Sequence, residues 1–458
     1  MEILPTIIAT AATSACRFPF ITQSALGQRF CPRAAAVVVV DDDDEVQDLA
    51  WRLSPSSQVL LPGDEGFFEA SRRWSAFDEP RPGIVVIPGV TSDVAKTVQY
   101  ANDHGTPFLA IGGGQHGATS TLGKLRGGLG IAMSTLDSIE LSADGQTAKL
   151  GGGALSKTVI DALWEAGKQT AWSGPAWAAA TAGCRAATGL IADQFVSMDV
   201  VLADGLLRAH HRRRALGPGP GGGLCVAPAT TLPFVTSVTL RVHDIAHPRP
   251  SRCVYTTLRT ATGRRATIIF SGDKVERVFQ TLHDTIFNND AQDVDVVVVV
   301  VVWWPSTPRH AAALWALGPV SVEDRPGTYR DLAAWTMISA ADAPCQKLGA
   351  ANLRFGLYLD AYDVSALQRV YDQFAAALRE TPAFAQSMFL FENYPVQGLR
   401  ARAAEDSAFA FRGDSILVAP LINFPPGDED AARKAVVLGE ALRDRCIMRR
   451  DARLGTRM

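Results

Sequence analysis

A run of glycines that contains one histidine is the feature of this sequence with the clearest chemical potential. The run consists of Gly112, Gly113, Gly114, Gln115, His116 and Gly117. Glycine has no Cβ, so several backbone N–H groups can approach one phosphate closely in such a turn. The run therefore predicts a nucleotide-binding site, and His116 places an imidazole next to it that could act as a nucleophile.

Two alternatives for this run stay open on the residues alone. Its spacing also satisfies the GxGxxG pattern of nicotinamide dinucleotide-binding turns, with Asp137 twenty residues after Gly117. That pattern needs a helix directly after the turn, whereas residues 118–130 contain four further glycines, which disfavour one. His116 could also be a turn histidine that bonds only to local backbone.

The elements around the run predict an α+β fold. Residues 83–88 form a short β-branched stretch that predicts a buried strand, and residues 107–111 predict another. Thr91, Ser92 and Asp93 can cap a helix over residues 94–104. An amphipathic helix is predicted over residues 157–166, and regular structure is expected to begin near Pro80.

A second block begins after residues 247–250, which predict a linker. Residues 296–302 are seven consecutive valines and predict one buried central strand. Helices are expected over 274–288 and 364–379. Further strands are expected over 253–258, 266–271, 352–359 and 415–421.

Composition and charge exclude several classes of function. The 458 residues are 47 % hydrophobic, enough for a buried core, and 44 basic against 47 acidic residues argue against a nucleic-acid partner. The basic run 210–214 has no aromatic platform beside it. No apolar run approaches the ~20 residues of a membrane span. The seven scattered cysteines contain no CxxC pair, so no metal site is predicted. The start of the chain lacks a basic region before its apolar stretch, which leaves secretion open.

Several ordered motifs resemble a known family. They are the segment 84–118 with its glycine–histidine run, residues 136–139, 145–152, 163–169, 193–205 and 235–244, and, in the second block, 392–394 and 408–412. Over roughly residues 60–425 the chain resembles fungal FAD-linked oxidases of the berberine bridge enzyme-like group, whose FAD-binding domain is of the p-cresol methylhydroxylase type.

The resemblance implies an organisation of the chain. We expect an irregular leader over 1–59 and a two-part FAD-binding domain over 60–247. A substrate domain over 248–425 is expected as an antiparallel sheet with helices on one face, followed by an incomplete C-terminal segment over 426–458. The last residues lack the Tyr/Asn-rich segment that covers the flavin in this group.

The resemblance also implies a cofactor site. Gly112, Gly113, Gly114 and Gly117 match the loop that holds the FAD pyrophosphate, and His116 matches the histidine that links the flavin covalently. Val200 and Val201 match a strand whose backbone packs against the flavin. Gln115 departs from the group, which has no residue between the glycines and the histidine, and this puts the position of the imidazole in doubt.

The implied function is an FAD-dependent oxidase of a secondary-metabolite alcohol, amine or sugar, with a small-molecule substrate and O₂ as partners. Tyr394 is the candidate base, because a phenol near a cation or flavin can be deprotonated; an ordinary packed tyrosine is the alternative. Two other classes stay open: a non-catalytic remnant that cannot hold FAD, and a nicotinamide-dependent dehydrogenase. Oligomeric state and substrate identity are not specified.

The sequence of two segments indicates that they are translated in a shifted reading frame. Back-translation of residues 177–186, read one offset away, gives Gly-Gly-Gly-His-Gly-Arg-Leu-Gln-Gly, a motif that the group has there and this chain lacks. The same offset turns residues 225–232 into Arg-Gly-Ala-Gly-His-Asn-Phe, a second missing motif. We therefore expect frame-shifted, poorly packed loops over about 175–188 and 206–232.

Overall fold

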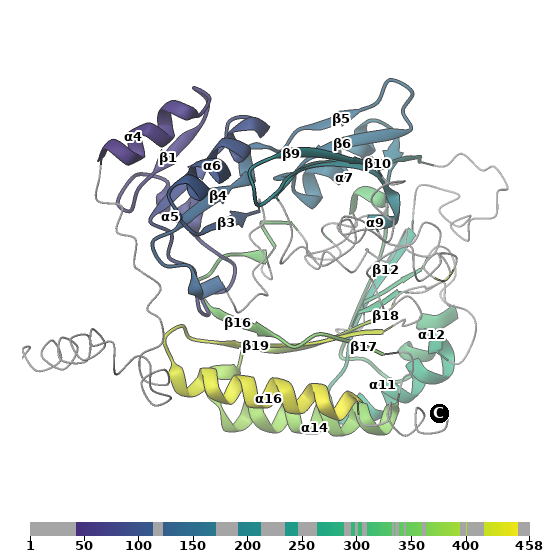
Figure 1. The fold of residues 1–458 in the computed structure, drawn as a ribbon. Coiled ribbons are helices and arrows are strands. Elements are labelled where there is room, and N and C mark those ends of the chain that lie inside the picture. The colour runs from purple at the N-terminus through teal and green to yellow at the C-terminus, as the bar shows by residue number, and fades with distance from the viewer. Residues whose placement is uncertain are drawn as a thin grey trace, which may run out of the picture.

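A computed structural model of the chain describes two bodies of regular structure, drawn in Figure 1. The residues described are 43–112, 122–170, 191–211, 234–245, 263–287, 295–297, 301–304, 309–331, 334, 339–342, 345–359, 363–393, 400 and 416–447.

The first body contains a small sheet that ends beside the glycine run. Its strands β2 (Ile84–Ile87), β4 (Leu129–Ala132) and β3 (Phe108–Ile111) are parallel neighbours in that order. The strand β1 (Gln58–Leu60) adds to β2 in antiparallel fashion. The strands β2 and β4 are short β-branched or small apolar runs and are buried almost throughout, as expected for parallel strands.

The helix α6 (Thr91–Asp103) joins β2 to β3 and packs against one face of this sheet. It begins at Thr91 rather than at residue 94. Its Val94 and Val98 lie in one buried cluster with Ile131 of β4 and Val201. The prediction of a helix between two strands is confirmed, with its start three residues earlier.

The expectation of an irregular leader over 1–59 is wrong for the part that the structure describes. The helix α4 (Asp43–Arg52) and β1 precede Pro80, and so does the short helix α5 (Phe67–Ser71). Leu49 is fully buried and packs with Ile84 and Leu129. The run of four aspartates at 41–44 suggested a solvated turn rather than the start of a helix.

A second sheet of the first body is antiparallel and carries one covering helix. The helix α7 (Ser156–Glu165) buries Val159 and Leu163 against Leu150 and Leu240 of the sheet. The described strands follow the order β5 (Ile139–Leu141), β6 (Thr147–Gly151), β10 (Phe234–Arg241), β8 (Phe195–Val201) and β9 (Leu207–His211).

The strand β9 corrects one expectation. Residues 206–232 were predicted to be a loop, yet residues 207–211 pair with β8 along its length. Leu207 remains 48 % exposed, so this pairing buries little apolar surface. Residues 212–232 and 175–188 lie outside the described residues.

The second body is a sheet of eight described strands with helices on one face. Figure 1 shows α14 (Val364–Glu380) and α16 (Glu429–Ile447) side by side beneath β19 (Ile416–Phe424). The strand order is β15 (Ser321–Gly327), β12 (Gly263–Ile269), β14 (Val301–Trp304), β13 (Asp295–Val297), β18 (Met388–Asn393), β19 and β16 (Ala351–Arg354), and β17 (Leu357–Leu359) also pairs with β19.

Two further expectations are corrected here. The valine run 296–302 is not one strand: β13 and β14 pair with each other in antiparallel fashion, with Val296 opposite Val302. The segment 426–458 is not separate from the substrate domain in its described part, because α16 covers the sheet. The remaining domain boundaries stay predictions.

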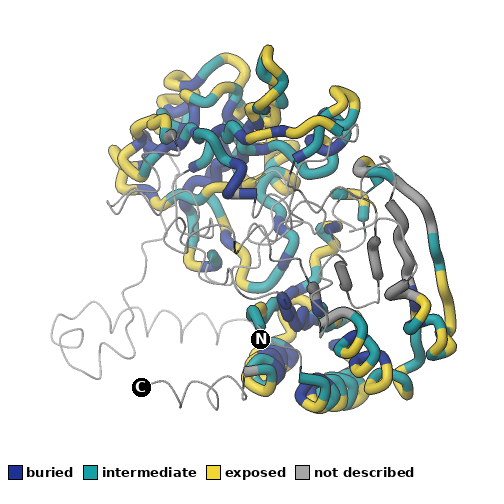
Figure 2. The backbone as a smooth tube through the Cα atoms, turned by 90° about the vertical axis from the view of Figure 1, so that its right-hand side faces the viewer, coloured by how far each residue is buried: buried dark blue, intermediate teal, exposed yellow. Residues whose placement is uncertain are grey.

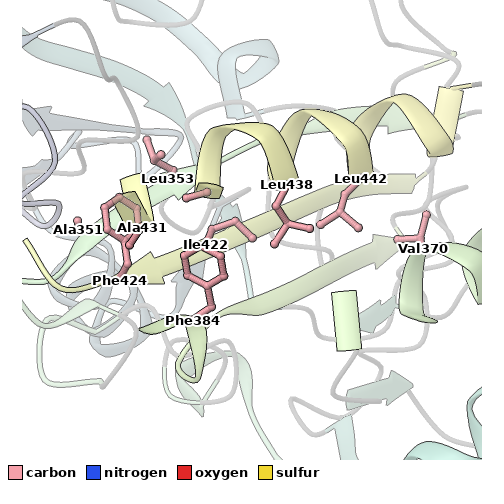
Figure 3. Close-up of a cluster of buried hydrophobic side chains, with 10 residues drawn as sticks. Ala351, Leu353, Val370, Phe384, Ile422, Phe424, Ala431, Leu438 and Leu442 are labelled. Carbon is pink, nitrogen blue, oxygen red and sulfur yellow. The ribbon is translucent and has the colours of Figure 1, made fainter. Parts of the chain in front are cut away.

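The core of the second body lies between this sheet and its helices. Figure 3 shows Leu438 and Leu442 of α16 packed over Ile422 of β19. Phe384 and Phe424 meet edge to face with ring centroids 6.4 Å apart. Figure 2 shows the buried segments inside each body and exposed turns around them. The predicted α+β class, with helices on one face of an antiparallel sheet, is confirmed.

Candidate functional site

The glycine run begins at an edge where three parallel strands end. Gly112 follows β3 directly, and the register Ile84–Leu129–Phe108 aligns the carboxyl ends of β2, β4 and β3. Ligands of parallel sheets bind beyond this edge, because backbone N–H groups and helix starts gather there. The fold therefore presents the run in the position that a nucleotide would need.

Gly112 itself fits a close-approaching cofactor. It is exposed, and a Cβ built on it meets no described atom within 4 Å. The backbone there is thus bare and accessible at the carboxyl edge, as a phosphate-binding turn requires. Gly113, Gly114, Gln115, His116 and Gly117 lie outside the described residues.

The connection that follows the run differs from a nicotinamide-binding turn. In the described part between the run and β4, residues 122–128, the structure has one 3₁₀ turn at Leu122–Lys124 and no α-helix. A nicotinamide dinucleotide fingerprint would place a helix directly after its glycines. This part of the fold therefore gives no support to the dehydrogenase alternative.

Val200 and Val201 lie in the middle of the second sheet. Both are fully buried, and their main chain pairs with β10 on one side and β9 on the other. The side chain of Val201 packs against Val94 and Val98 of α6. The side chain of Val201 therefore stabilises the contact between the two sheets, and a backbone contact of both valines with the flavin stays a prediction.

Three consecutive glycines at the end of β6 bring the two sheets of the first body together. A Cβ on Gly151 would lie 2.0 Å from the carbonyl oxygen of Leu136, and one on Gly152 would lie 2.1 Å from that of Val235. On Gly153 it would lie 2.0 Å from the carbonyl oxygen of Met133. Only glycine permits this approach, which holds the segment after β4 against the second sheet.

The two bodies are joined by a polar contact that the sequence did not suggest. The Ser75 hydroxyl donates to the carbonyl oxygen of Asn352 at 2.8 Å and accepts from its N–H at 2.9 Å. The Asn352 side-chain amide donates to the carbonyl oxygen of Trp74 at 3.1 Å. The face of the second sheet that carries the Asn352 side chain therefore faces the first body (Figure 1).

Tyr394, the predicted base, lies outside the described residues, directly after β18. That strand pairs with β13 and β19 in the middle of the sheet. The predicted cofactor loop thus follows a strand of the first body, and the predicted base follows a strand of the second.

Sequence reasoning missed one cation on the same sheet face. Arg354 alternates with the core residues Ala351 and Leu353 in β16, as Asn352 does. Its Nε atom is buried and has no hydrogen-bond partner. The polar–apolar alternation over residues 351–355 was the signal that could have found it.

The described cysteines do not provide a reactive thiolate. Burial raises the pKa of the Cys446 thiol to about 12 and that of Cys345 to about 11, the latter with help from Asp342. Both thiols are therefore protonated at neutral pH. Among the described residues there is no group of three or more His, Cys, Asp or Glu side chains that could hold a metal.

No described helix combines the length and the apolar character that crossing a membrane requires.

Comparison with known proteins agrees with this site. The model of an FAD-binding domain matches residues 82–209, which include the glycine run and both valines. The FAD-linked oxidoreductase chyH of Penicillium rubens is 33 % identical over 435 residues, covering 87 % of this chain and 82 % of the relative.

Two solved structures share the fold. The berberine bridge enzyme-like protein 1 of Physcomitrella patens gives a TM-score of 0.67 at 16 % identity, covering 88 % of each chain. A chitooligosaccharide oxidase gives 0.64 at 16 % identity, covering 88 % of this chain and 87 % of the other. With its FAD-binding domain and its fungal relatives, the chain belongs to the FAD-linked oxidoreductases, and it shares the fold of berberine bridge enzyme-like proteins.

Proposed function

We propose that the protein oxidises an alcohol, amine or sugar of secondary metabolism and uses O₂ as the electron acceptor. Membership of the FAD-linked oxidoreductases supports the cofactor and the reaction class. The observation that carries the proposal is the bare, exposed Gly112 at the carboxyl edge of β2, β4 and β3. One protein of the same fold is named an oxidase, which is consistent with O₂ as acceptor.

The chemistry divides between cofactor and chain. FAD, when bound, takes a hydride from a substrate carbon and passes two electrons to O₂, which leaves as hydrogen peroxide after uptake of two protons. Backbone N–H groups of Gly112, Gly113, Gly114 and Gly117 would hold the pyrophosphate. His116 would anchor the flavin, and the backbone of Val200 and Val201 would line it.

Tyr394 is proposed as the base that accepts the substrate's hydroxyl or amine proton. It directly follows a central strand of the second sheet, on the domain assigned to the substrate. A phenol can act in this way where a neighbouring positive charge favours its ionised form. Its removal should lower turnover about 10²–10⁴-fold, the usual contribution of a general base.

The first experiment concerns the cofactor. A chain with its frame restored over 175–188 and 206–232 should stay yellow after acid precipitation, and His116→Ala should release the flavin into the supernatant. Flavin that dissociates from the unsubstituted chain in acid would contradict the covalent link. A frame-restored chain that binds no FAD would contradict the proposed function.

The second experiment concerns turnover. Hydrogen peroxide is measured over a panel of alcohols, amines and sugars, and then with Tyr394→Phe on the best substrate. Tyr371→Phe is the matched control, because Tyr371 lies on α14 and packs with the cluster between helices and sheet. Equal loss in both variants would contradict a specific role for Tyr394.

A further inference from the structure

The side chains of β16 alternate between two environments. Ala351 and Leu353 pack into the helix-covered core, which Figure 3 shows beneath α16. Asn352 and Arg354 therefore belong to the opposite face, because successive side chains of a strand alternate. Asn352 confirms the direction of that face, since its side chain donates a hydrogen bond to Trp74 of the first body.

The side chain of Arg354 on this face has no partner among the described residues. The residue is half-buried, its Nε atom is buried, and within the described chain its side chain forms no hydrogen bond and no ion pair. By contrast, Arg52, Arg330 and Arg433 are each paired with a carboxylate. The Nη atoms of this guanidinium are not among the buried atoms without a partner, so they stay accessible to a ligand that supplies hydrogen-bond acceptors.

The strand register gives Arg354 apolar neighbours. Leu421 of β19 lies opposite it, and Met388 of β18 lies opposite Leu421, in one row across the sheet. Leu421 is buried and Met388 is 37 % exposed. A ligand that carries an anionic group beside an apolar part is complementary to this row, since the anion would pair with the cation and the apolar part would contact the apolar side chains.

We propose that Arg354 is a specificity-determining residue that binds a carboxylate of the substrate by a paired hydrogen bond. This inference rests on the proposed function, because it takes the face between the bodies as the substrate side of the enzyme. It narrows the substrate class to small organic acids whose remaining part is apolar. Guanidinium groups favour carboxylates because two parallel N–H donors match two oxygens.

The test uses the full chain and titration calorimetry with benzoate. Benzamide is the neutral probe of the same shape. The unsubstituted protein should bind benzoate more tightly than benzamide, and Arg354→Met should weaken benzoate about tenfold or more while leaving benzamide unchanged. Arg330→Met is the control, because that exposed arginine already pairs with Asp161 at 3.2 Å.

Arg354→Lys provides a second measurement if the methionine variant does not fold. It keeps the charge and loses the paired geometry, so benzoate should weaken several-fold and benzamide should not change. Equal benzoate affinity in Arg354→Lys or Arg354→Met and the unsubstituted protein would overturn the proposal. Absence of benzoate binding to the unsubstituted protein would also overturn it.

The anion that binds Arg354 could also be a phosphate of the cofactor. An FAD titration of the same variants distinguishes a cofactor phosphate from a substrate carboxylate. Unchanged FAD affinity with weakened benzoate supports the substrate carboxylate. Weakened FAD affinity with unchanged benzoate overturns the proposal. If the frame-restored chain binds no FAD but benzoate still depends on Arg354, the anion site stands and the proposed oxidase function fails.

Discussion

A single buried carboxylate organises the start of α6. Asp93 accepts hydrogen bonds from the Ser54 N–H at 2.9 Å and the Ser54 hydroxyl at 2.7 Å. It also accepts from the Ser57 hydroxyl at 2.8 Å and from the N–H groups of Gly89 and Val90 at 3.1 and 2.9 Å. These bonds fix the turn after β2, from which α6 leads to β3 and the glycine run.

Asp93→Asn should destabilise the protein by about 2–4 kcal/mol at neutral pH, because donors in a buried site lose a charged acceptor. Burial alone would raise the pKa of Asp93, but the bonds from Ser54, Ser57 and Val90 lower it below its usual value. The carboxylate therefore contributes stability above the unfolded pKa of about 3.9, and this contribution is lost as pH falls through the folded pKa.

Urea unfolding of both proteins at several pH values measures this effect. The difference in unfolding free energy should be greatest above about pH 5 and shrink towards acid pH. Asp144→Asn is the control, because Asp144 is exposed and bonds only within its own turn. A difference that does not change with pH would contradict a charged role for Asp93.

At this scale the sequence indicated part of the site. Thr91, Ser92 and Asp93 were expected to cap a helix, and the side chain of Asp93 does so from inside the first turn. Gly112 was singled out because a glycine run after an apolar stretch carries a local signal, and its role in binding the cofactor stays a prediction. The serine partners of Asp93 lie 36 and 39 residues away, and no local pattern encodes such a pairing.

Among the elements, the glycine tract after β6 makes a direct prediction. Gly152→Ala should destabilise the first body by about 1–3 kcal/mol or more, because the added methyl group would meet the carbonyl oxygen of Val235 at 2.1 Å. Gly356→Ala is the matched control, since its nearest described neighbour lies at 3.9 Å. Similar melting temperatures for both variants would show that the backbone has room to move there.

Gly112→Ala tests the cofactor edge separately from stability. No described atom lies within 4 Å of the added methyl group, and the glycine does not need a left-handed conformation. The melting temperature without FAD should therefore stay within experimental error of the unsubstituted value. FAD affinity should fall about tenfold or more, since a phosphate held by backbone N–H groups is pushed away. Unchanged FAD affinity would remove Gly112 from the proposed loop.

Restoring the reading frame over 175–188 and 206–232 should strengthen FAD binding more than roughly a thousandfold. The restored Gly-Gly-Gly-His-Gly loop would add about three charge-assisted contacts at ~1.5–3 kcal/mol each, and ~1.4 kcal/mol corresponds to tenfold in affinity. Equilibrium titration with FAD measures both chains. Equal affinity, or a transcript that confirms the present frame, would contradict the frame-shift hypothesis.

The valine run shows why some elements could not be predicted. Seven identical β-branched residues signal a strand strongly, but they carry no alternation and no turn residue that would mark a reversal. The structure reverses the chain within the run, since Val297 pairs with Val301. The pairing of β13 with β18 and of β14 with β12 determines this outcome, and both partners lie far along the chain.

On the scale of the whole molecule, the contact between the bodies includes a buried hydrogen-bonded junction at Ser75. Ser75→Ala should destabilise the protein by about 1–3 kcal/mol, because the buried N–H and carbonyl groups of Asn352 both lose their partner. Arg330→Ala removes a second described contact between the bodies, an exposed ion pair with Asp161, and should cost less than about 1 kcal/mol.

Chemical denaturation of both variants separates a buried junction from a surface pair. If Arg330→Ala proved the more damaging of the two, the surface pair would be the principal connection between the bodies. Because FAD is proposed to bind in the first body and the substrate on the second, Ser75→Ala should also raise the KM of an identified substrate more than Arg330→Ala does.

The ordered motifs made the family, the α+β class and the helix-covered sheet predictable from the sequence. Each motif reports a local conformation, and their order along the chain reports the fold. Contacts between distant segments could not be predicted from the sequence: the packing of α4 against the first sheet, the packing of α16 against the sheet of the second body, and the Ser75–Asn352 junction. These depend on tertiary burial, which local composition does not encode.

The Ser75–Asn352 junction also has a consequence for the order in which the protein is made. The two residues are 277 positions apart in the chain. At a synthesis rate of about 5–20 residues per second, Ser75 leaves the ribosome roughly 15–55 seconds before its partner exists. During that interval the segment around Ser75 must not form other stable contacts within the nascent first body. Codon changes that alter translation speed between these positions should therefore change the yield of folded protein without changing one amino acid.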